Sequence, residues 1–235
     1  MTSPDSLPVG PLVDPTPAPR PRRVTLEGRH VRIVPFDLAA HGREIFEASS
    51  GAENDGLWAY MGQGPFADFE SFSAHYGEAA KKDDPLLFAI LDGATGRAIG
   101  HAALMRIVPN DRVVEVGNIL YTPPMQRTIG ATEAMYLMAR HAFDDLGYRR
   151  YEWKCNDLNQ PSKRAALRYG FHYEGTFRQH MIIKGRNRDT AWFAMLDSEW
   201  PQVKAAFEAW LDPANFDAEG RQRTRLDGSV EIASD

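Results

Sequence analysis

A short polar segment at positions 126–132, with the sequence QRTIGAT, has the composition of a phosphate-binding turn. It follows a β-branched and aromatic run at 113–121 and leads into apolar residues at helical spacing from Ala131 to Leu146. A strand that turns sharply into a helix leaves unpaired N–H groups at the helix start, and these groups attract phosphate. The glycine and the small residues let a diphosphate approach the backbone. The segment therefore predicts a diphosphate site, although many helices begin in this way without a ligand.

The elements around this turn are predicted from periodicity and turn residues. Before the turn we expect two strand pieces within 24–36, helices at 37–50 and 68–82, and an antiparallel meander of strands at 86–91, 98–107 and 113–121. After the central helix, which Gly147 ends, we expect a strand at 148–154, a helix at 157–169, a hairpin of 171–183 and 189–196, and a last helix capped by Ser198.

The order of these elements predicts an α/β fold of the mixed kind. A strand–helix–strand unit over 113–154 implies parallel pairing through a right-handed crossover. The flanking hairpins imply antiparallel pairing, so we expect a mostly antiparallel central sheet with helices on both faces. Trp58, Tyr60 and Met61 lie in a glycine-containing loop, where they either line a pocket or fill the core.

Composition suggests one large domain with a tail at each end. Residues 1–22 are rich in proline and predict an extended arm that is mobile or lies on a neighbouring surface, or else a ligand for another protein's groove. Residues 23–212 form the expected domain, and a charged tail covers 213–235.

The net charge of −5 argues against nucleic acid as a partner and slightly favours cationic substrates. The single cysteine, Cys155, excludes an intrachain disulfide and a cysteine-cluster metal site, so we expect no metal. The chain shows neither a signal peptide nor an apolar window long enough for a bilayer, which predicts a cytoplasmic protein without a membrane partner.

Three motifs carry a family resemblance. They are QRTIGATEA at 126–134, the N-x-x-S pattern at 159–162, and GFHYEG at 170–175. In this order and spacing they resemble the GNAT acetyltransferase superfamily, most closely its RimJ/RimL-like branch. The resemblance implies acetyl-CoA as co-substrate, a protein N-terminus or small primary amine as acceptor, direct transfer in a ternary complex, and a possible homodimer. One departure is that Arg127 and Ile129 stand where the family turn usually has glycine.

The resemblance also implies which residues hold the cofactor. The turn residues Gln126, Arg127, Thr128, Ile129, Gly130, Ala131 and Thr132 would bind the diphosphate. The backbone of Ile119, Leu120 and Tyr121 would hold and polarise the thioester, helped by a bulge at Gly117-Asn118. Asn159 would bind the pantetheine amides, or only cap its helix. Arg149-Arg150 and Lys163-Arg164 would meet the outer phosphate, or only form a solvated charged face.

Acetyl transfer needs a base for the amine and a proton for the departing thiolate. Glu115 is the first candidate base, its alternative being a surface strand glutamate, and His180 is the second. Some RimL-like enzymes use a glutamate on the late strand, where this chain has Met181. Ser162 would supply the proton, or would bond its own backbone. The altered turn leaves open a second reading, a non-catalytic acyl-CoA-binding protein.

Overall fold

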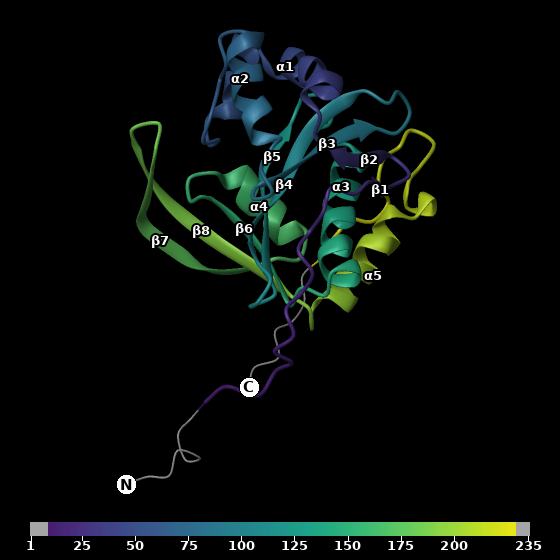
Figure 1. Cartoon of the computed structure of the whole chain (residues 1–235). Coiled ribbons are helices and arrows are strands. Elements are labelled where there is room, and N and C mark those ends of the chain that lie inside the picture. The colour runs from purple at the N-terminus through teal and green to yellow at the C-terminus, as the bar shows by residue number, and fades with distance from the viewer. Residues whose placement is uncertain (1–8, 229–235) are drawn as a thin grey trace.

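The computed structural model describes residues 9–228, so the first eight residues of the predicted arm and the last seven of the predicted tail lie outside the described part. Its strands form one sheet in the order β1-β2-β3-β4-β5-β6-β8-β7 (Figure 1). Only β5 and β6 pair in parallel, and all other neighbours are antiparallel. The predicted mixed, mostly antiparallel sheet is confirmed.

The strands are β1 Leu26–Glu27, β2 Val31–Pro35, β3 Leu86–Asp92, β4 Ala98–Val108, β5 Val113–Tyr121, β6 Arg150–Asn156, β7 His172–Ile183 and β8 Arg186–Leu196. The α-helices are α1 Arg43–Ser49, α2 Phe69–Ala79, α3 Ile129–Arg140, α4 Gln160–Arg168 and α5 Trp200–Leu211. Shorter helical segments are η2 Leu38–Gly42, η3 Ala52–Trp58, η4 His141–Asp145 and η5 Pro213–Asn215. None of the helices in the described residues is long and apolar enough to cross a bilayer.

Helices cover both faces of the sheet, as Figure 1 shows for α1 and α2 on one side and α3 and α5 on the other. Strand β3 explains why, because nearly every residue in it is buried. Leu87 and Ala89 pack in the cluster that contains α1 and α2, whereas Phe88 and Ile90 pack in the cluster that contains α3. Successive side chains of a strand point to opposite faces, so a continuously apolar strand requires cover on both.

The parallel pair β5–β6 separates part-way along its length. The ladder joins residues 113–116 to residues 150–153, although β5 continues to Tyr121 and β6 to Asn156. On its other edge β5 carries the predicted bulge, because the register with β4 shifts between His101 and Ala103, and Asn118 adopts a φ of 48°. The two strands therefore diverge at their carboxyl ends and leave a cleft between them.

Helix α3 is fixed to the amino-terminal hairpin by one buried carboxylate. Glu133 accepts the backbone N–H groups of Arg29, His30 and Val31 at 2.8, 2.6 and 2.9 Å. Gly130 lies against the same hairpin, since a Cβ there would come within 2.7 Å of the Val31 side chain. Part of the segment predicted to bind diphosphate therefore serves packing between α3 and β2.

Parts of both the arm and the tail lie against the domain. In the arm, Ala18 is buried and donates its N–H to the carbonyl of Pro109 at 3.0 Å. In the tail, Leu226 is buried in the core, and the N–H of Gly228 donates to the carbonyl of Arg168 at 3.2 Å. Apolar anchors within the charged tail explain why residues 213–228 fold back on the domain.

Two predicted helix starts differ from the structure. Ser198 does not cap α5, because its N–H donates to the Asp197 side chain and the helix begins at Trp200 with Glu199 in the cap position. Helix α4 begins at Gln160, because the Asn159 side chain accepts the N–H of Ser162 and ends the preceding turn. Local capping chemistry decides both boundaries.

A buried histidine makes the stability of this fold sensitive to acid. His101 has no exposed surface, its Nε2 lies 2.7 Å from the Tyr76 hydroxyl, and burial lowers the pKa of its imidazole to about 3. The unfolded chain binds this proton near the ordinary pKa of 6.5, so the stabilisation is complete above that value and is lost as pH falls toward 3. We expect the free energy of unfolding to fall by about 2 kcal/mol between pH 7 and pH 5 through this residue.

Urea unfolding over this pH range measures the effect. His101→Gln should flatten the profile by about that amount, whereas His180→Gln, at an exposed position, should leave it unchanged. An unchanged slope in His101→Gln would show that the imidazole is not the responsible group.

Candidate active site

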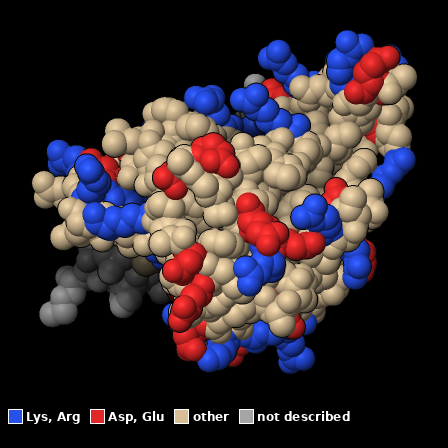
Figure 2. Space-filling view, turned by 90° about the horizontal axis from the view of Figure 1, so that it is seen from above, with Lys and Arg blue, Asp and Glu red and all other residues tan. Residues whose placement is uncertain are grey.

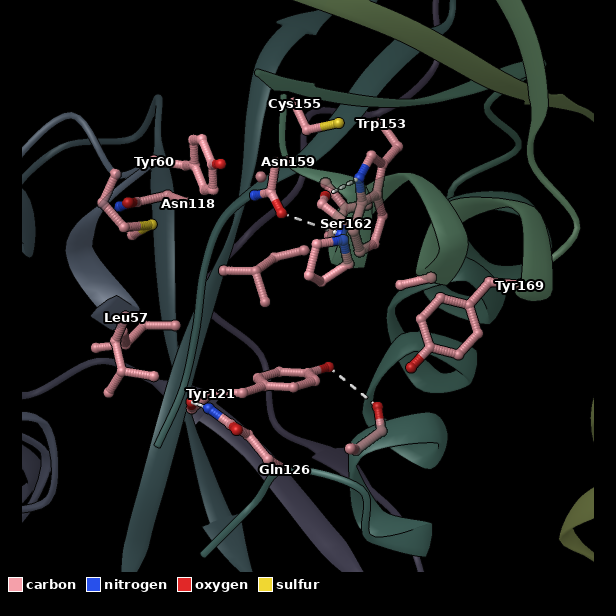
Figure 3. A pocket seen from close by; sticks show the side chains of 18 of the residues that line it. Leu57, Tyr60, Asn118, Tyr121, Gln126, Trp153, Cys155, Asn159, Ser162 and Tyr169 are labelled. Atoms are coloured by element: carbon pink, nitrogen blue, oxygen red, sulfur yellow. Dashed lines mark hydrogen bonds between the residues drawn. The ribbon is translucent and has the colours of Figure 1, made fainter. Parts of the chain in front are cut away.

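A cavity of about 1420 Å³ fills the space between the diverging ends of β5 and β6. At one end it is bordered by the turn before α3 and by α4, and at the other by Glu115, Arg106 and Lys154. The main chain of β5 from Gly117 to Tyr121 runs between the two ends. Figure 3 shows the side chains of Tyr121, Asn159, Ser162 and Tyr169 around this space. The volume exceeds that of a typical single small-molecule site, so two ligands can meet in it.

The predicted diphosphate turn borders the cavity with every residue of 126–132 except Gly130. Three of its amides are already used, because the N–H of Gln126 donates to Thr122, that of Thr128 to Met125, and that of Ala131 to the Thr128 side chain. The N–H groups of Arg127, Ile129 and Gly130 form no hydrogen bond with the described residues. They leave a set of donors at the start of α3, where the helix dipole favours an anion.

Two arginines of α4 extend the cationic character of this end. Arg164 and Arg168 border the cavity, and Arg168 Nη1 donates to the Thr132 hydroxyl at 3.0 Å. The Arg168 guanidinium also lies 4.9 Å from the centre of the Trp210 ring. Neither arginine forms an ion pair with a carboxylate in the described residues, so both can meet phosphate oxygens.

Of the other three predicted cations of this region, Arg150 and Lys163 have carboxylate partners. Arg150 pairs with Glu152 and Glu174 at 2.7 and 2.5 Å, and Lys163 pairs with Asp157 at 2.8 Å. These two side chains therefore belong to the charged surface of the fold, which was the alternative left open for them.

Asn159 and Ser162 stand beside each other at the start of α4 (Figure 3). Asn159 Oδ1 accepts the N–H of Ser162 at 3.1 Å, so the capping role is present, and its Nδ2 faces the cavity. Ser162 Oγ accepts the indole N–H of Trp153 at 3.0 Å. This contact occupies an oxygen lone pair and does not use the hydroxyl proton. Cys155 also borders the cavity, and burial raises the pKa of its thiol.

Glu115 is not a surface glutamate, because only 3% of its side chain is exposed. Its Oε2 lies 2.6 Å from Arg106 Nη1 and 3.0 Å from Lys154 Nζ, which in turn lies 2.6 Å from Glu152. Charges of opposite sign thus alternate across three neighbouring strands. Both cations contact the Oε2 oxygen of Glu115. The other oxygen, Oε1, lies near Gly117 and is the one that can reach a water or an amine.

The hairpin of β7 and β8 lines the cavity with residues other than the predicted His180. His180 lies on an exposed part of β7, where Nδ1 is 3.0 Å from the Thr190 hydroxyl, and it does not border the cavity. Met181 and Ile183 of the same strand do border it. The loop that contains Trp58, Tyr60 and Met61 was expected either to fill the core or to line a pocket. Trp58 is buried in the core, whereas Tyr60 and Met61 line the cavity.

A model of the acetyltransferase (GNAT) domain matches residues 32–172 of the chain. The chain belongs to the GNAT family of acetyltransferases. A GCN5-related N-acetyltransferase from Brucella melitensis is 50% identical, covers 90% of this chain and 96% of its own, and superposes with a TM-score of 0.88. A GNAT-family protein from Chromobacterium violaceum is 36% identical over 85% of this chain and 100% of its own, with a TM-score of 0.77. "Probable N-acetyltransferase YjcK" of Bacillus subtilis is 26% identical over 74% of this chain and 98% of its own length.

Membership of the GNAT family makes this chain an acetyltransferase, and GNAT acetyltransferases use acetyl-CoA as co-substrate. Several residues of the GNAT motifs nevertheless have structural roles. Glu133 of the first motif holds the β1–β2 hairpin, and Glu174 of the third pairs with Arg150. Gly170 adopts a φ of 88° with Gly228 packed on it, where a Cβ would come within 2.7 Å of the Gly228 carbonyl.

Arg127 stands at a glycine position of the usual GNAT turn, and its backbone has a conformation that favours glycine. It adopts a φ of 62°, a left-handed conformation that glycine enters freely and other residues enter at a cost of about 1–2 kcal/mol. We expect Arg127→Gly to be more stable than Arg127→Ala by about 1 kcal/mol, the reverse of the usual order of the two residues. Urea unfolding of the two variants measures the difference. A more stable alanine variant would contradict the strained geometry.

Several residues that border the site were not predicted from the sequence. Arg168 and Tyr169 end α4, and Trp210, Phe216 and Gln222 bring the carboxyl-terminal segment to the cavity wall. Trp210 Nε1 donates to Gln222 at 2.8 Å, which joins that segment to α5. The i, i+4 spacing of Arg164 and Arg168 was the available signal, because it places both on one side of a helix.

Proposed function

We propose that this GNAT protein transfers an acetyl group from acetyl-CoA directly to a primary amine while both are bound. The observation that supports this most is the single cavity in which Ser162 and Glu115 border opposite parts of one strand cleft. A cofactor bound across the cleft leaves Ser162 on the leaving-group side and Glu115 on the acceptor side. Direct transfer then needs no covalent enzyme intermediate.

At the end of the cavity near α3 and α4, each protein group binds a different part of acetyl-CoA. The free N–H groups at Arg127, Ile129 and Gly130 bind the diphosphate, and Arg164 and Arg168 neutralise its charge. The amide of Asn159 binds the pantetheine arm while its oxygen caps α4. The arm then runs along β5, where the ladder with β6 has ended.

The acetyl group lies beside the bulge of β5. Main-chain N–H groups at Ile119 to Tyr121 polarise the thioester carbonyl and stabilise the oxyanion that forms on attack. The amine arrives protonated, and Glu115 Oε1 accepts its proton, directly or through one water. Nitrogen attacks the carbonyl carbon, and the carbon–sulfur bond breaks as the nitrogen loses its second proton. The sulfur, stabilised by a hydrogen bond from the Ser162 hydroxyl, takes up a proton in its place and leaves as the free thiol of CoA. Holding both reactants in one cavity supplies much of the rate.

The acceptor classes that we propose are those of the RimJ/RimL-like branch, protein N-termini and small amines. The enzyme with acetyl-CoA and a panel of N-terminal peptides, amino acids and polyamines should release free thiol with at least one class. Tight binding of acetyl-CoA without thiol release from any of them would instead favour the non-catalytic acyl-CoA-binding reading.

A further inference from the structure

The acceptor end of the cavity carries a partly buried arginine that no carboxylate of the described residues neutralises. Arg188 of β8 stands opposite Met181 of β7 in the strand register, and both border the cavity. Its Nε donates to the Thr190 hydroxyl at 3.2 Å, and it forms no ion pair with a carboxylate in residues 9–228. The side chain is partly buried, and desolvation lowers the pKa of its guanidinium. A partly desolvated cation without a counterion is costly unless a ligand completes it.

The neighbouring carboxylates cannot serve as that counterion. Glu115 is shared by Arg106 and Lys154, and Glu152 is shared by Lys154 and Arg150. Glu115 and Glu152 therefore each have two basic partners already. Arg188 therefore adds positive charge at an end of the cavity where the acids are already paired.

A second cavity of about 550 Å³ adjoins the first and adds more positive charge. The two cavities share Tyr60, Asn156, Ile183 and Arg188. Lys184 and Arg186 border the second cavity, against Asp55 as its acidic residue. Lys184 Nζ donates to the carbonyl of Trp58 at 2.8 Å and has no carboxylate partner in the described residues.

The acid next to Arg188 in the sequence is occupied. Asp189 accepts the N–H of Gln179 at 2.7 Å and the side-chain amide of Asn187 at 2.9 Å, and it borders neither cavity. The positive charge is also local, because basic and acidic side chains are mixed over the face seen from above in Figure 2. The acceptor end thus favours an anionic group on the substrate.

We propose that the acceptor is an amine that also carries a carboxylate, which pairs with Arg188 while the amine faces Glu115. This inference rests on the proposed function and narrows its substrate class. Arginine binds a carboxylate through two parallel hydrogen bonds, which fixes the orientation of the acceptor as well as its affinity. A polyamine, which has no carboxylate, is disfavoured at the same place.

The test compares matched acceptors that differ only in this charge. Carboxy-terminally amidated peptides of equal length with a free amino terminus and Glu or Gln at the second position form one arm, and free glutamine and glutamine α-amide form the other. One arm should contain the natural class of substrate. In that arm we expect kcat/KM to be about 10- to 100-fold higher for the acceptor with the carboxylate than for its neutral match. Equal use of both members in both arms, or a preference for spermidine, would overturn the proposal.

Variants of the arginine separate recognition from folding. Arg188→Gln should lower kcat/KM for the carboxylate acceptor about 10- to 100-fold and leave the neutral acceptor and the KM for acetyl-CoA within about twofold. Arg188→Lys should restore part of the loss, since it keeps the charge without the paired donors. Arg97→Gln, at an exposed position on the β3–β4 turn, is the control and should change nothing.

Binding measurements keep this inference separate from catalysis. If no acceptor is acetylated, the proposed function fails, and titration of the same matched acceptors into the CoA complex still decides the role of Arg188. Tighter binding of the carboxylate member, lost in Arg188→Gln, supports the inference. Equal binding of both members contradicts it.

Discussion

Replacing Ser162 with alanine is expected to lower kcat about 100-fold while the KM for acetyl-CoA stays within about twofold. The hydroxyl oxygen accepts the Trp153 indole N–H at 3.0 Å, so this contact does not use the hydroxyl's own proton. The departing sulfur develops negative charge late in the reaction, and a donor aimed there stabilises the transition state more than the bound thioester. Steady-state kinetics with a thiol reagent, at saturating amine, measures both constants.

A second substitution separates the serine from its support. Trp153→Phe removes the indole donor but leaves the hydroxyl, so we expect a smaller loss of kcat, about 3- to 10-fold. Thermal unfolding of both variants checks that the fold is intact. A full kcat in Ser162→Ala, or a larger loss in Trp153→Phe than in Ser162→Ala, would remove Ser162 from the leaving-group role.

The largest expected effect on stability comes from Glu133. Its carboxylate accepts three backbone N–H groups within residues 29–31, and Glu133→Ala leaves these donors without partners beneath α3. A buried donor left unsatisfied costs about 1–3 kcal/mol, and bonds to a charged group are at the strong end. We expect the free energy of unfolding to fall by about 3–5 kcal/mol, measured by urea denaturation.

The control for this variant is a glutamate of the same kind on an exposed helix face. Glu78→Ala removes an ion pair between side chains that are 72% and 70% exposed, and it should cost less than about 0.5 kcal/mol. A loss in Glu133→Ala that is no larger than in Glu78→Ala would mean that the amino-terminal hairpin does not depend on the carboxylate.

Local chemistry in the sequence was sufficient for most of the fold. The apolar run of β3, the glycine after η4 and the order of strands and helices each depend on short-range patterns, and the structure has them where they were expected. The bulge at Gly117-Asn118 is confirmed for the same reason. The predicted site residues Gln126, Asn159 and Ser162 all border one cavity, because their motifs lie at the ends of adjacent elements.

The rest of the site depends on which side chains meet across strands that are distant in the sequence. Neither Lys154 nor Arg188 stands out in a single-strand pattern, and their importance follows from the register of β5, β6 and β8. The same holds for Glu133, whose partners lie about a hundred positions earlier in the chain. His180 shows the converse, since its residue type suggested a base but its side chain on β7 does not border the cavity.

A crystal structure of the enzyme with bound CoA tests the central claim most directly. The account predicts the diphosphate at the N–H groups of Arg127, Ile129 and Gly130, the pantetheine arm in the cleft where β5 and β6 have separated, and the sulfur within hydrogen-bonding distance of Ser162 Oγ. A cofactor bound outside that cleft, or a sulfur that lies away from both Ser162 and the bulge of β5, would contradict it.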